Sequence, residues 1–273
     1  MIIKTLVGNT ALNDSFKCEH GLCLYIESSG KKLLMDLGSS DLFLENAKKS
    51  NVEVADIDYV VISHGHYDHS GGLNAFLNIN NKAKVFIHKA VFDNHHYLKP
   101  DKSVKYIGLD QSLKNHTQIV LTSENFIIDD NFEVILSDSG SVINSNSNQG
   151  SLKVVDEKLV FDKFIQKQNL IIKEGDISVL FSGCSHNGII NIVDKYKDLK
   201  GSVTRYLIGG FHLNSKTFKT ESFKTVDKIA EYLFDSEIKC YTGHCTGVDA
   251  YNRMKIIMAN NLKYLTIGNK IEI

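Results

Sequence analysis

Four side chains that can bind metal ions lie within a six-residue segment of the chain. The surrounding sequence is Ser63-His64-Gly65-His66-Tyr67-Asp68-His69-Ser70-Gly71-Gly72. His64 and His66 are two residues apart, so in an extended segment their side chains project from the same side and can bind one ion through imidazole nitrogens. Asp68 and His69, in the following turn, can face a second ion. Two divalent ions about 3.5–4 Å apart bring the pKa of a bound water near 7 and hold a substrate oxygen, which is the chemistry of hydrolysis.

The elements around this segment are expected to position it. A strand is predicted over residues 59–63, directly before the histidines, and a helix over 71–78 follows them. Gly71 and Gly72 are expected to let the backbone turn sharply into that helix. A less specific interpretation places the histidines on a surface loop or at an adventitious metal site, but a dense, spaced pattern after an apolar strand favours a functional role.

Short β-branched and apolar runs alternate with helical patterns along the whole chain. Strands are predicted at 2–7, 22–27, 32–36, 59–63, 84–88, 169–173, 177–182, 204–208 and 238–242. Helices are predicted at 41–50, with Asp41 as the N-cap, and at 71–78, 188–196, 220–234 and 249–258. Each half of the chain therefore predicts a mixed sheet with helices on its outer face, and two such sheets stacked together would form four layers.

The length of 273 residues suits a single domain, 1–273, made of two similar halves at about 1–136 and 152–273. Between the halves, residues 137–151 are rich in Ser, Asn and Gly and show no periodicity. This composition predicts a segment that does not pack, either a linker between the halves or a mobile loop over a site.

Composition excludes several classes of protein. The hydrophobic fraction of 42% and the charged fraction of 23% are typical of a folded domain. With 31 Lys+Arg against 32 Asp+Glu, the net charge is −1, so no broad positive field attracts nucleic acid. The first residues contain only a short apolar run, which argues against a signal peptide or a membrane span. We therefore expect a cytoplasmic protein with neither a nucleic-acid nor a membrane partner.

The five cysteines are expected to be reduced, because their number is odd and the sequence shows no secretion signal. Cys184 and Cys245, each close to a histidine, are the two that suggest chemistry. Cys18, His20 and Cys23 resemble a small metal knuckle, but no second ligand pair occurs at a matching spacing. Ordinary buried thiols are therefore favoured for Cys18 and Cys23.

Several of these motifs resemble those of a known family. The segment from His64 to Gly72 looks like the signature of the metallo-β-lactamase superfamily, and Asp36-Leu37-Gly38 resembles its early strand-end motif. Three further blocks resemble one branch, the metal-dependent hydrolases similar to dihydropterin-methyl-ribofuranosylaminobenzene-phosphate synthase. These blocks are Phe181-Ser182-Gly183-Cys184-Ser185-His186-Asn187-Gly188, Gly209-Gly210-Phe211-His212-Leu213 and Gly243-His244-Cys245-Thr246-Gly247. The resemblance covers nearly the whole chain and implies an α/β (α+β) fold, a four-layer αββα sandwich of the metallo-β-lactamase type.

The resemblance also implies a set of metal ligands and their ions. It assigns, position by position, His64, His66, Asp68, His69, His186 and His244 as ligands of two divalent transition-metal ions. Asp68 would also orient the attacking nucleophile, which makes it the expected catalytic residue. Asp36 is expected to orient a metal-bound imidazole through a hydrogen bond and not to bind the metal itself.

The sequence departs from the wider superfamily where a bridging carboxylate is usual. Gly183-Cys184 stands where most members have Gly-Asp. Either Cys184 binds metal as a thiolate, or His186 or His212 completes the coordination from a shifted position. A thiolate favours zinc, whereas histidines and carboxylates also accept iron or manganese. Zn²⁺ is therefore the expected ion, with Mn²⁺ and Fe²⁺ as alternatives, and the number of ions stays open.

The other histidines receive different predictions. For His212, a role in the site is favoured over a turn cap, because the glycines before it allow a close approach to a ligand. The remaining histidines lack partners at ligand spacing and are predicted to lie on the surface or in the core; they are His20, His88, His95, His96 and His116. The segment His95-His96-Tyr97, predicted to be irregular, could still reach a substrate.

These residues predict a metal-dependent hydrolase in which a metal-bound hydroxide attacks an ester, lactone, thioester or phosphodiester. The resemblance implies that this substrate is small and anionic or phosphorylated. Two alternatives remain. A di-iron redox enzyme would use an attached flavin domain, and no flavodoxin-like segment follows residue 247. A non-catalytic metal-binding sensor would fit Gln166 and Lys167, which stand where the branch usually has acidic residues. The expected partner is a small-molecule substrate, and the oligomeric state is not predicted.

Overall fold

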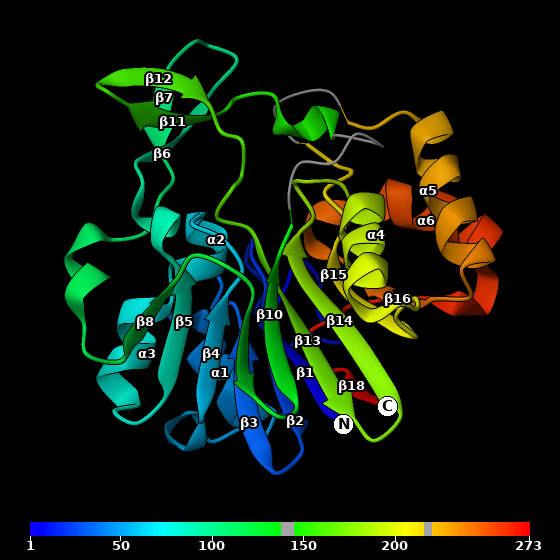
Figure 1. Cartoon of the computed structure of the whole chain (residues 1–273), viewed down its shortest axis with the longest axis horizontal. Helices are drawn as coiled ribbons and strands as arrows, with labels where there is room; N and C mark the ends of the chain where they lie inside the picture. The colour runs from blue at the N-terminus through cyan, green and yellow to red at the C-terminus, as the bar shows by residue number, and fades with distance from the viewer. Residues whose placement is uncertain (138–144, 216–219) are drawn as a thin grey trace.

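Two seven-stranded β-sheets pack face to face in the part of the chain that this computed structural model describes, residues 1–137, 145–215 and 220–273 (Figure 1). The first sheet has the strand order β18 (Lys270–Glu272), β1 (Ile2–Val7), β2 (Cys23–Ser28), β3 (Lys31–Met35), β4 (Tyr59–Ile62), β5 (Lys84–His88) and β8 (Ile119–Thr122). The second has the order β17 (Leu262–Tyr264), β16 (Lys239–Thr242), β15 (Tyr206–Gly210), β14 (Ile177–Cys184), β13 (Gln168–Glu174), β10 (Phe132–Leu136) and β9 (Phe126–Asp129). A smaller sheet above them has the order β12 (Lys158–Phe161), β11 (Ser151–Val155), β6 (His95–Leu98) and β7 (Val104–Tyr106).

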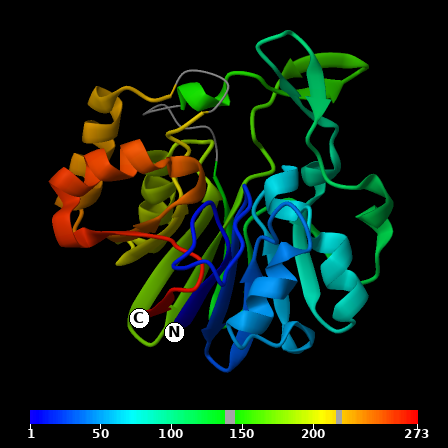
Figure 2. The ribbon, with the colours of Figure 1, turned by 180° about the vertical axis from the view of Figure 1, so that it is seen from behind.

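Helices cover the outer face of each large sheet (Figures 1 and 2). On the first sheet these are α1 (Leu42–Lys49) and α3 (Leu73–Ile79), with the short α2 (Tyr67–Ser70) at its upper end. On the second sheet they are α4 (Ile189–Lys200), α5 (Phe223–Asp235) and α6 (Val248–Met258). The layers therefore run helix, sheet, sheet, helix, which confirms the predicted αββα sandwich. Among the helices described, none is both long and apolar enough to cross a bilayer.

Alternation along the strands builds the cores between these layers. Leu24 of β2 and Leu170 of β13 belong to the core between the two sheets. Their neighbours Cys23 and Ile171 belong to the cores beneath the helices of the first and second sheet. Because each sheet is apolar on both faces, each must be covered on both sides, which fixes the order of the layers.

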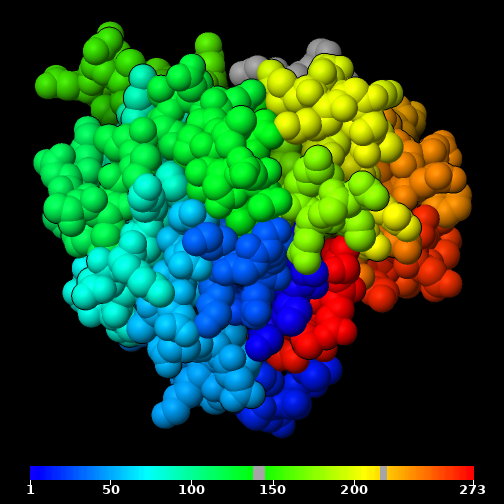
Figure 3. Space-filling model, turned by 60° about the horizontal axis from the view of Figure 1, so that its bottom comes forward, coloured from blue at the N-terminus to red at the C-terminus, as the bar shows by residue number. Residues whose placement is uncertain are grey.

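The two large sheets exchange strands. β9 and β10 precede the predicted loop yet lie in the second sheet, and β18 pairs antiparallel with β1 in the first. The amino group of Met1 donates a hydrogen bond to the Ile273 carbonyl oxygen at 2.7 Å. The first and last segments, in blue and red, are seen side by side from behind and from below (Figures 2 and 3). The boundary between the sheets is therefore not the predicted division at 137–151, and the similarity of the two halves stays a prediction.

The carboxyl ends of parallel strands meet at the upper edge of the sandwich in Figure 1. In the first sheet β3, β4, β5 and β8 run parallel to one another, and in the second sheet so do β14, β15, β16 and β17. Open sheets bind ligands beyond the carboxyl ends of their parallel strands. The loops that leave this edge carry most of the predicted metal ligands.

The structure confirms one local expectation and adds a sheet that was not predicted. Asp41 is the N-cap residue of α1, as expected, although its side chain makes no capping hydrogen bond and Ser40 Oγ accepts from the Leu42 N–H at 3.1 Å instead. The small upper sheet was not predicted, because its strands are short and exposed side chains such as Phe161 break the apolar alternation.

The segment 137–151 packs where it is described. Residues 138–144 lie outside the described part of the chain. Ser145 and Ser147 are buried, residues 146–148 form a turn of 3₁₀ helix, and Ser151 begins β11. The prediction that this composition would not pack is therefore wrong for residues 145–151, because neighbouring loops supply hydrogen-bond partners to its polar side chains.

Candidate metal centre

Strand-end loops from both sheets bring metal-binding side chains together at the upper edge of the sandwich. Asp36 follows β3, His64 follows β4, Cys184 ends β14, His212 follows β15 and His244 follows β16. Apart from His212, these residues are at most 3% exposed. The site therefore lies across the top of the core between the sheets, and neither sheet alone contains it.

The HxHxDH segment connects β4 to the short helix α2. His64 lies in the stretch between them, and His66 is the N-cap residue of α2, with φ −79° and ψ 141°. Asp68 and His69 lie within α2. The extended stretch therefore carries the first two predicted ligands and the helical turn the next two.

The glycines after this segment have a different role from the predicted sharp turn. Gly71 has an ordinary helical φ of −63°. A Cβ at Gly71 would lie 2.2 Å from the Ser39 carbonyl oxygen, and one at Gly72 would lie 2.4 Å from the Leu37 carbonyl oxygen. Glycine is needed here because the end of α2 packs directly against the backbone of the loop after β3.

His64, His66 and His186 form a group that we call the histidine cluster. One ligand nitrogen from each ring lies within 4.8 Å of the others, and all three side chains are buried. Each Nε2 atom is enclosed and has no hydrogen-bond partner among the described residues. Buried polar atoms in native proteins normally have partners. Three converging lone pairs without one are therefore the arrangement expected around a cation.

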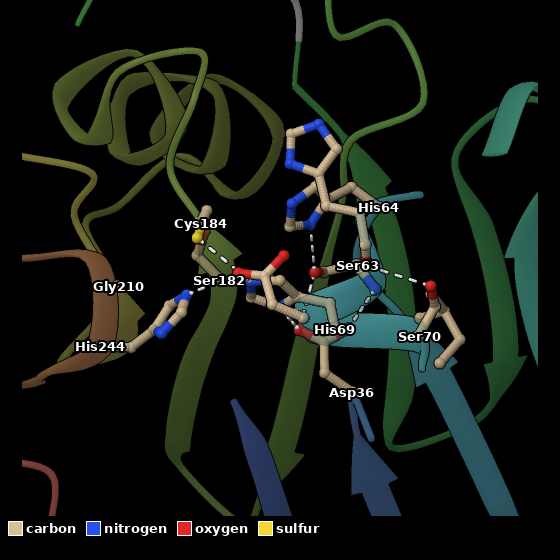
Figure 4. Close-up of polar contacts among 12 residues, drawn as sticks. Asp36, Ser63, His64, His69, Ser70, Ser182, Cys184, Gly210 and His244 are labelled. Atoms are coloured by element: carbon tan, nitrogen blue, oxygen red, sulfur yellow. Dashed lines mark hydrogen bonds and ion pairs between the residues drawn. The ribbon is translucent and has the colours of Figure 1, made fainter. Parts of the chain in front are cut away.

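Asp68, His69, Cys184 and His244 form a second group that we call the mixed cluster. Asp68 Oδ2 lies 3.3 Å from His244 Nε2 and 3.6 Å from His69 Nε2. His69 Nε2 also lies 3.2 Å from Cys184 Sγ (Figure 4). A carboxylate, a thiol and two imidazoles are a donor set that suits zinc. Cys184 Sγ is also within 4.8 Å of the ligand nitrogens of His64 and His69, so it lies between the two clusters.

Asp36 connects the two clusters from below. Its Oδ1 accepts from the Ser63 main-chain N–H at 2.7 Å, and its Oδ2 accepts from Ser63 Oγ at 2.7 Å and from His69 Nδ1 at 2.6 Å (Figure 4). His64 Nδ1 in turn donates to Ser63 Oγ at 2.9 Å. Both rings thereby carry a proton on Nδ1, which leaves the Nε2 lone pairs for the clusters. Asp36 thus has a hydrogen-bond path to two of the predicted ligands.

Two asparagines hold two other imidazoles in the same way. Asn148 Oδ1 accepts from His186 Nδ1 at 2.7 Å, and Asn148 Nδ2 donates to the His186 carbonyl oxygen at 2.7 Å. Asn9 repeats the pattern on His244 at 3.2 Å and 3.4 Å. These residues could not be identified from the sequence, because they lie 38 and 235 positions from their partners and an isolated asparagine carries no motif.

Three residues of the site have left-handed backbone conformations that non-glycine residues rarely adopt. The φ angle is +60° at Asp36, +53° at His212 and +50° at His244. Such conformations cost about 1–3 kcal/mol each and concentrate at functional sites. The surrounding structure therefore holds these loops in conformations that direct their side chains into the site.

Burial favours the neutral form of the histidine cluster. It lowers the pKa of His64 and His186 well below 6.5, and nearby positive charge, including that of Lys167, adds to the shift. Burial likewise lowers the pKa of His66 to about 3. Neutral imidazole is the form that binds metal, so this cluster is ready for a cation at neutral pH.

The mixed cluster instead carries charge. Burial opposes ionisation of Asp68, but His69 and His244 beside it hold the pKa of its carboxyl well below 3.8. Burial also opposes protonation of His244, yet Cys245 and Asp68 raise its pKa above 6.5. Burial raises the pKa of the Cys184 thiol, so a bound metal would be needed to make it a thiolate.

Lys167 is a buried cation close to the histidine cluster. Its side chain is 1% exposed, and its Nζ has no hydrogen-bond partner among the described residues. Burial lowers its pKa to about 8, and its charge lowers the pKa values of His64 and His186. The same positive charge favours a thiolate at Cys184 against the effect of burial. Lys167, which stands where the branch usually has an acidic residue, therefore lies at the candidate site.

The donor set fits the predicted metal. Within the described residues, ring nitrogens without hydrogen-bond partners occur on His64, His66, His186 and His212, and His244 Nε2 faces the Asp68 carboxylate at 3.3 Å. An isolated core histidine normally bonds through its ring nitrogens, so their gathering at one place is best explained by a cation. The thiol of Cys184 among them favours zinc.

Two histidines outside the motif also reach the site. The ring of His212 lies 3.9 Å from that of His186, as expected for a residue of the site. His20 lies on the surface, as predicted, but its Nε2 lies 3.4 Å from Asp68 Oδ2 and its ring lies 4.7 Å from that of His244. No spacing in the sequence indicates this contact, since the loop that carries His20 reaches α2 only in the fold.

Three further sequence expectations have mixed outcomes. The prediction of a buried thiol is confirmed for Cys23 and wrong for Cys18, which is exposed. His95 lies in β6 and not in an irregular stretch, and it is buried. Its Nδ1 lies 2.8 Å from Asp162 Oδ2 and its Nε2 lies 3.0 Å from the Ala90 carbonyl oxygen, so it is a satisfied core histidine.

A cavity of about 660 Å³ opens over both clusters. His66, Asp68, Cys184, His186, His212 and His244 line its metal-binding side. Pockets of roughly 300–1,000 Å³ are typical of sites for small molecules. The arrangement can therefore hold a small molecule against a metal centre.

Comparisons with known proteins identify the family. Residues 17–143 match the family described as the metallo-beta-lactamase superfamily. Over all of its length the chain is 32% identical to an uncharacterized protein of Methanocaldococcus jannaschii, which is covered completely. The chain belongs to the metallo-beta-lactamase superfamily, as its motifs predicted.

One named relative and two solved structures are similar to this chain over nearly its whole length. The 7,8-dihydropterin-6-methyl-4-(beta-D-ribofuranosyl)-aminobenzene-5'-phosphate synthase of Methanocaldococcus jannaschii is 29% identical over 95% of this chain and 92% of its own length. The crystal structure of a metal-dependent hydrolase of the β-lactamase superfamily has a TM-score of 0.84 and 26% identity, with 100% of this chain and 99% of the other covered. The metallo-beta-lactamase fold protein YhfI from Bacillus subtilis shares the fold at 12% identity, with a TM-score of 0.61 and 99% of both chains covered.

Proposed function

We propose that this protein is a metal-dependent hydrolase that acts on a small anionic ester, lactone, thioester or phosphodiester. The observation that carries the proposal is the convergence of the unpartnered Nε2 atoms of His64, His66 and His186 next to a cavity that His66, His186 and Asp68 line. Bound divalent cations would supply Lewis-acid activation of water and of a substrate oxygen. Membership of the superfamily supports the same class of reaction.

The side chains have distinct proposed roles. The histidine cluster would hold one ion and the mixed cluster a second. Asp36, Asn148 and Asn9 would keep the imidazole rings oriented through their Nδ1 atoms. Asp68, ionised and lining the cavity, would bind metal and also accept a hydrogen bond from the attacking nucleophile.

The thiol of Cys184 supports Zn²⁺ over Mn²⁺ or Fe²⁺ and weakens the di-iron alternative, because thiolate ligands prefer softer ions. The proposed partner is a small molecule, since the cavity has the size of a small-molecule site and the net charge of −1 offers no field for nucleic acid. A synthase reaction on a phosphorylated aromatic compound is a second candidate, because the relative that is 29% identical is named for one.

Metal content and turnover together test the proposal. Elemental analysis of the purified protein is expected to find stoichiometric zinc. The double variant His64→Ala, His66→Ala is expected to lose more than about 100-fold in metal affinity, beyond the range found for residues that only orient ligands. His116→Ala, which removes a histidine from the loop before β8, serves as the matched control and should keep the metal.

A panel of bis(4-nitrophenyl) phosphate, a homoserine lactone and a thioester, each assayed with zinc, manganese and iron, tests the activity. Turnover that disappears in the double variant and persists in His116→Ala supports the hydrolase. Full metal content in the double variant would refute the site. A fully loaded wild-type protein that turns over none of these compounds would favour the non-catalytic metal-binding protein.

A further inference from the structure

The cavity over the metal centre is asymmetric in charge. Asp68, on the metal side, is the one acidic residue among the described residues of its wall. Lys99 and Lys105 line the wall formed by the small upper sheet, and both are exposed. Because the chain has almost no net charge, these lysines are a local source of attraction for an anionic group.

The lysines belong to a hairpin with a well-defined turn. The Lys99 N–H donates to the Ser103 carbonyl oxygen at 2.8 Å, which closes the turn between β6 and β7. Pro100, the single proline of the chain, fixes the backbone next to Lys99. Asp101 in the same turn accepts hydrogen bonds from the N–H and Oγ of Ser103 at 2.9 Å and 2.6 Å and does not line the cavity.

The hairpin is attached directly to the metal-binding segment. The Tyr67 N–H donates to the Ile107 carbonyl oxygen at 2.8 Å. Lys105 Nζ lies 4.8 Å from the centre of the Tyr67 ring, close enough for a cation–π contact. Because Tyr67 directly precedes Asp68, Lys105 has a fixed place relative to the metal centre.

The remaining wall suits the body of an organic molecule. Tyr67, Tyr97 and Ile107 line the same cavity and present aromatic and apolar surface. Surface of this kind binds a ring or a hydrocarbon segment of a ligand. A small number of polar groups then sets the orientation of that ligand.

We propose that Lys99 and Lys105 bind a phosphate monoester group of the substrate, remote from the bond that reacts at the metal centre. This proposal rests on the proposed function, because it takes the metal side of the cavity as the place of reaction. Apart from histidines, Lys99 and Lys105 are the basic side chains among the described residues of the wall. Two ammonium groups act as point charges, and a phosphate monoester carries about two negative charges at neutral pH.

A matched pair of ligands tests this assignment by calorimetry on the zinc-loaded protein. Hexyl phosphate has one phosphate, which the metal centre can bind, whereas 1,6-hexanediol bisphosphate has a second phosphate at the other end of a flexible spacer. Each lysine is expected to contribute about two- to fivefold, the range of exposed ion pairs. The wild-type protein is therefore expected to prefer the bisphosphate by more than the roughly twofold advantage that two equivalent ends supply.

Variants of Lys99 and Lys105 test whether these side chains cause the preference for the bisphosphate. The double variant Lys99→Ala, Lys105→Ala is expected to lose this preference while keeping its zinc content, and Lys99→Arg, Lys105→Arg should keep most of it. Lys102→Ala is the matched control, because Lys102 lies in the same turn but does not line the cavity. Equal binding of the two ligands by the wild-type protein would refute the proposal, and so would an equal loss of preference in Lys102→Ala.

Hydrolysis of bis(4-nitrophenyl) phosphate, which has no monoester group, tests the proposed function separately. A protein that prefers the bisphosphate through Lys99 and Lys105 but hydrolyses nothing would retain the phosphate site and lose the assignment as a hydrolase. A protein that hydrolyses the diester but shows no preference between the ligands would remain a hydrolase without this phosphate site.

Discussion

The histidine cluster and the mixed cluster lie side by side and share Asp36 beneath them, yet they differ in how their side chains are prepared for a metal. In the histidine cluster, burial holds three imidazoles neutral. In the mixed cluster, Asp68 is ionised and raises the pKa of His244. Desolvation thus sets the protonation states of the histidine cluster, whereas charge pairs set those of the mixed cluster.

Residues of the same sequence motif therefore lie in two different electrostatic environments. His66 and Asp68 are two residues apart, but the first faces buried rings and the second faces His20, His69 and His244. The mixed cluster also contains the thiol that replaces the usual carboxylate. We therefore expect the two clusters to respond differently to substitution and to pH.

The largest expected effect comes from Asp36, since it supports both clusters. Asp36→Asn keeps the shape of the side chain and suits the left-handed backbone at φ +60°. It removes the carboxylate that receives hydrogen bonds from Ser63 and His69. The affinity for zinc is expected to fall about 10–100-fold, the usual range for residues that orient ligands.

Zinc titration of Asp36→Asn should show whether the loss concerns both clusters. Asp56→Asn, at an exposed carboxylate that pairs with Lys32, is the matched control and should bind zinc as the wild-type protein does. If the loss were confined to one binding event, Asp36 would not connect the two clusters.

A smaller effect should separate the clusters through their asparagines. Asn148→Ala removes two hydrogen bonds of 2.7 Å to His186, and about a tenfold loss of zinc affinity is expected. Asn9→Ala removes longer contacts, 3.2 Å and 3.4 Å, to His244, so its effect should be smaller. Competition with a chromophoric chelator measures both. A larger loss in Asn9→Ala would reverse the proposed order of the two contacts.

The smallest expected effect is on the stability of the chelator-treated protein at different pH. The pKa of His66 is lowered from 6.5 to about 3, so stability is lost as the pH falls below 6.5. The pKa of His244 is raised, so its contribution is present below 6.5 and is lost as the pH rises through the raised value.

Between about pH 7 and pH 5, each lowered histidine should remove roughly 1–2 kcal/mol from the free energy of unfolding. Urea denaturation at the two pH values measures the change. His66→Gln should reduce the loss on acidification, and His244→Gln should increase it. A wild-type protein that becomes more stable at the lower pH would show that the histidine cluster is not held neutral by burial.

The alternation of short apolar runs with helical patterns suggested the layered fold, because strand and helix periods are local properties of the chain, and the resemblance to the superfamily implied the αββα sandwich. β1 through β5 and the helices α1, α4, α5 and α6 lie close to their predicted positions. The small upper sheet and the exchange of β18 into the first sheet could not be predicted, since they depend on pairing between segments far apart in the sequence.

The sequence by itself determined that His64, His66, Asp68 and His69 would lie in one short segment, because the spacing of neighbouring residues limits where their side chains can point. Only the tertiary structure decided which distant residues join them. Asn9, His20, Asn148 and Lys167 reach the site from loops that carry no recognisable pattern. Burial and charge depend on these non-local neighbours, so the chemistry that distinguishes the two clusters arises in the folded molecule.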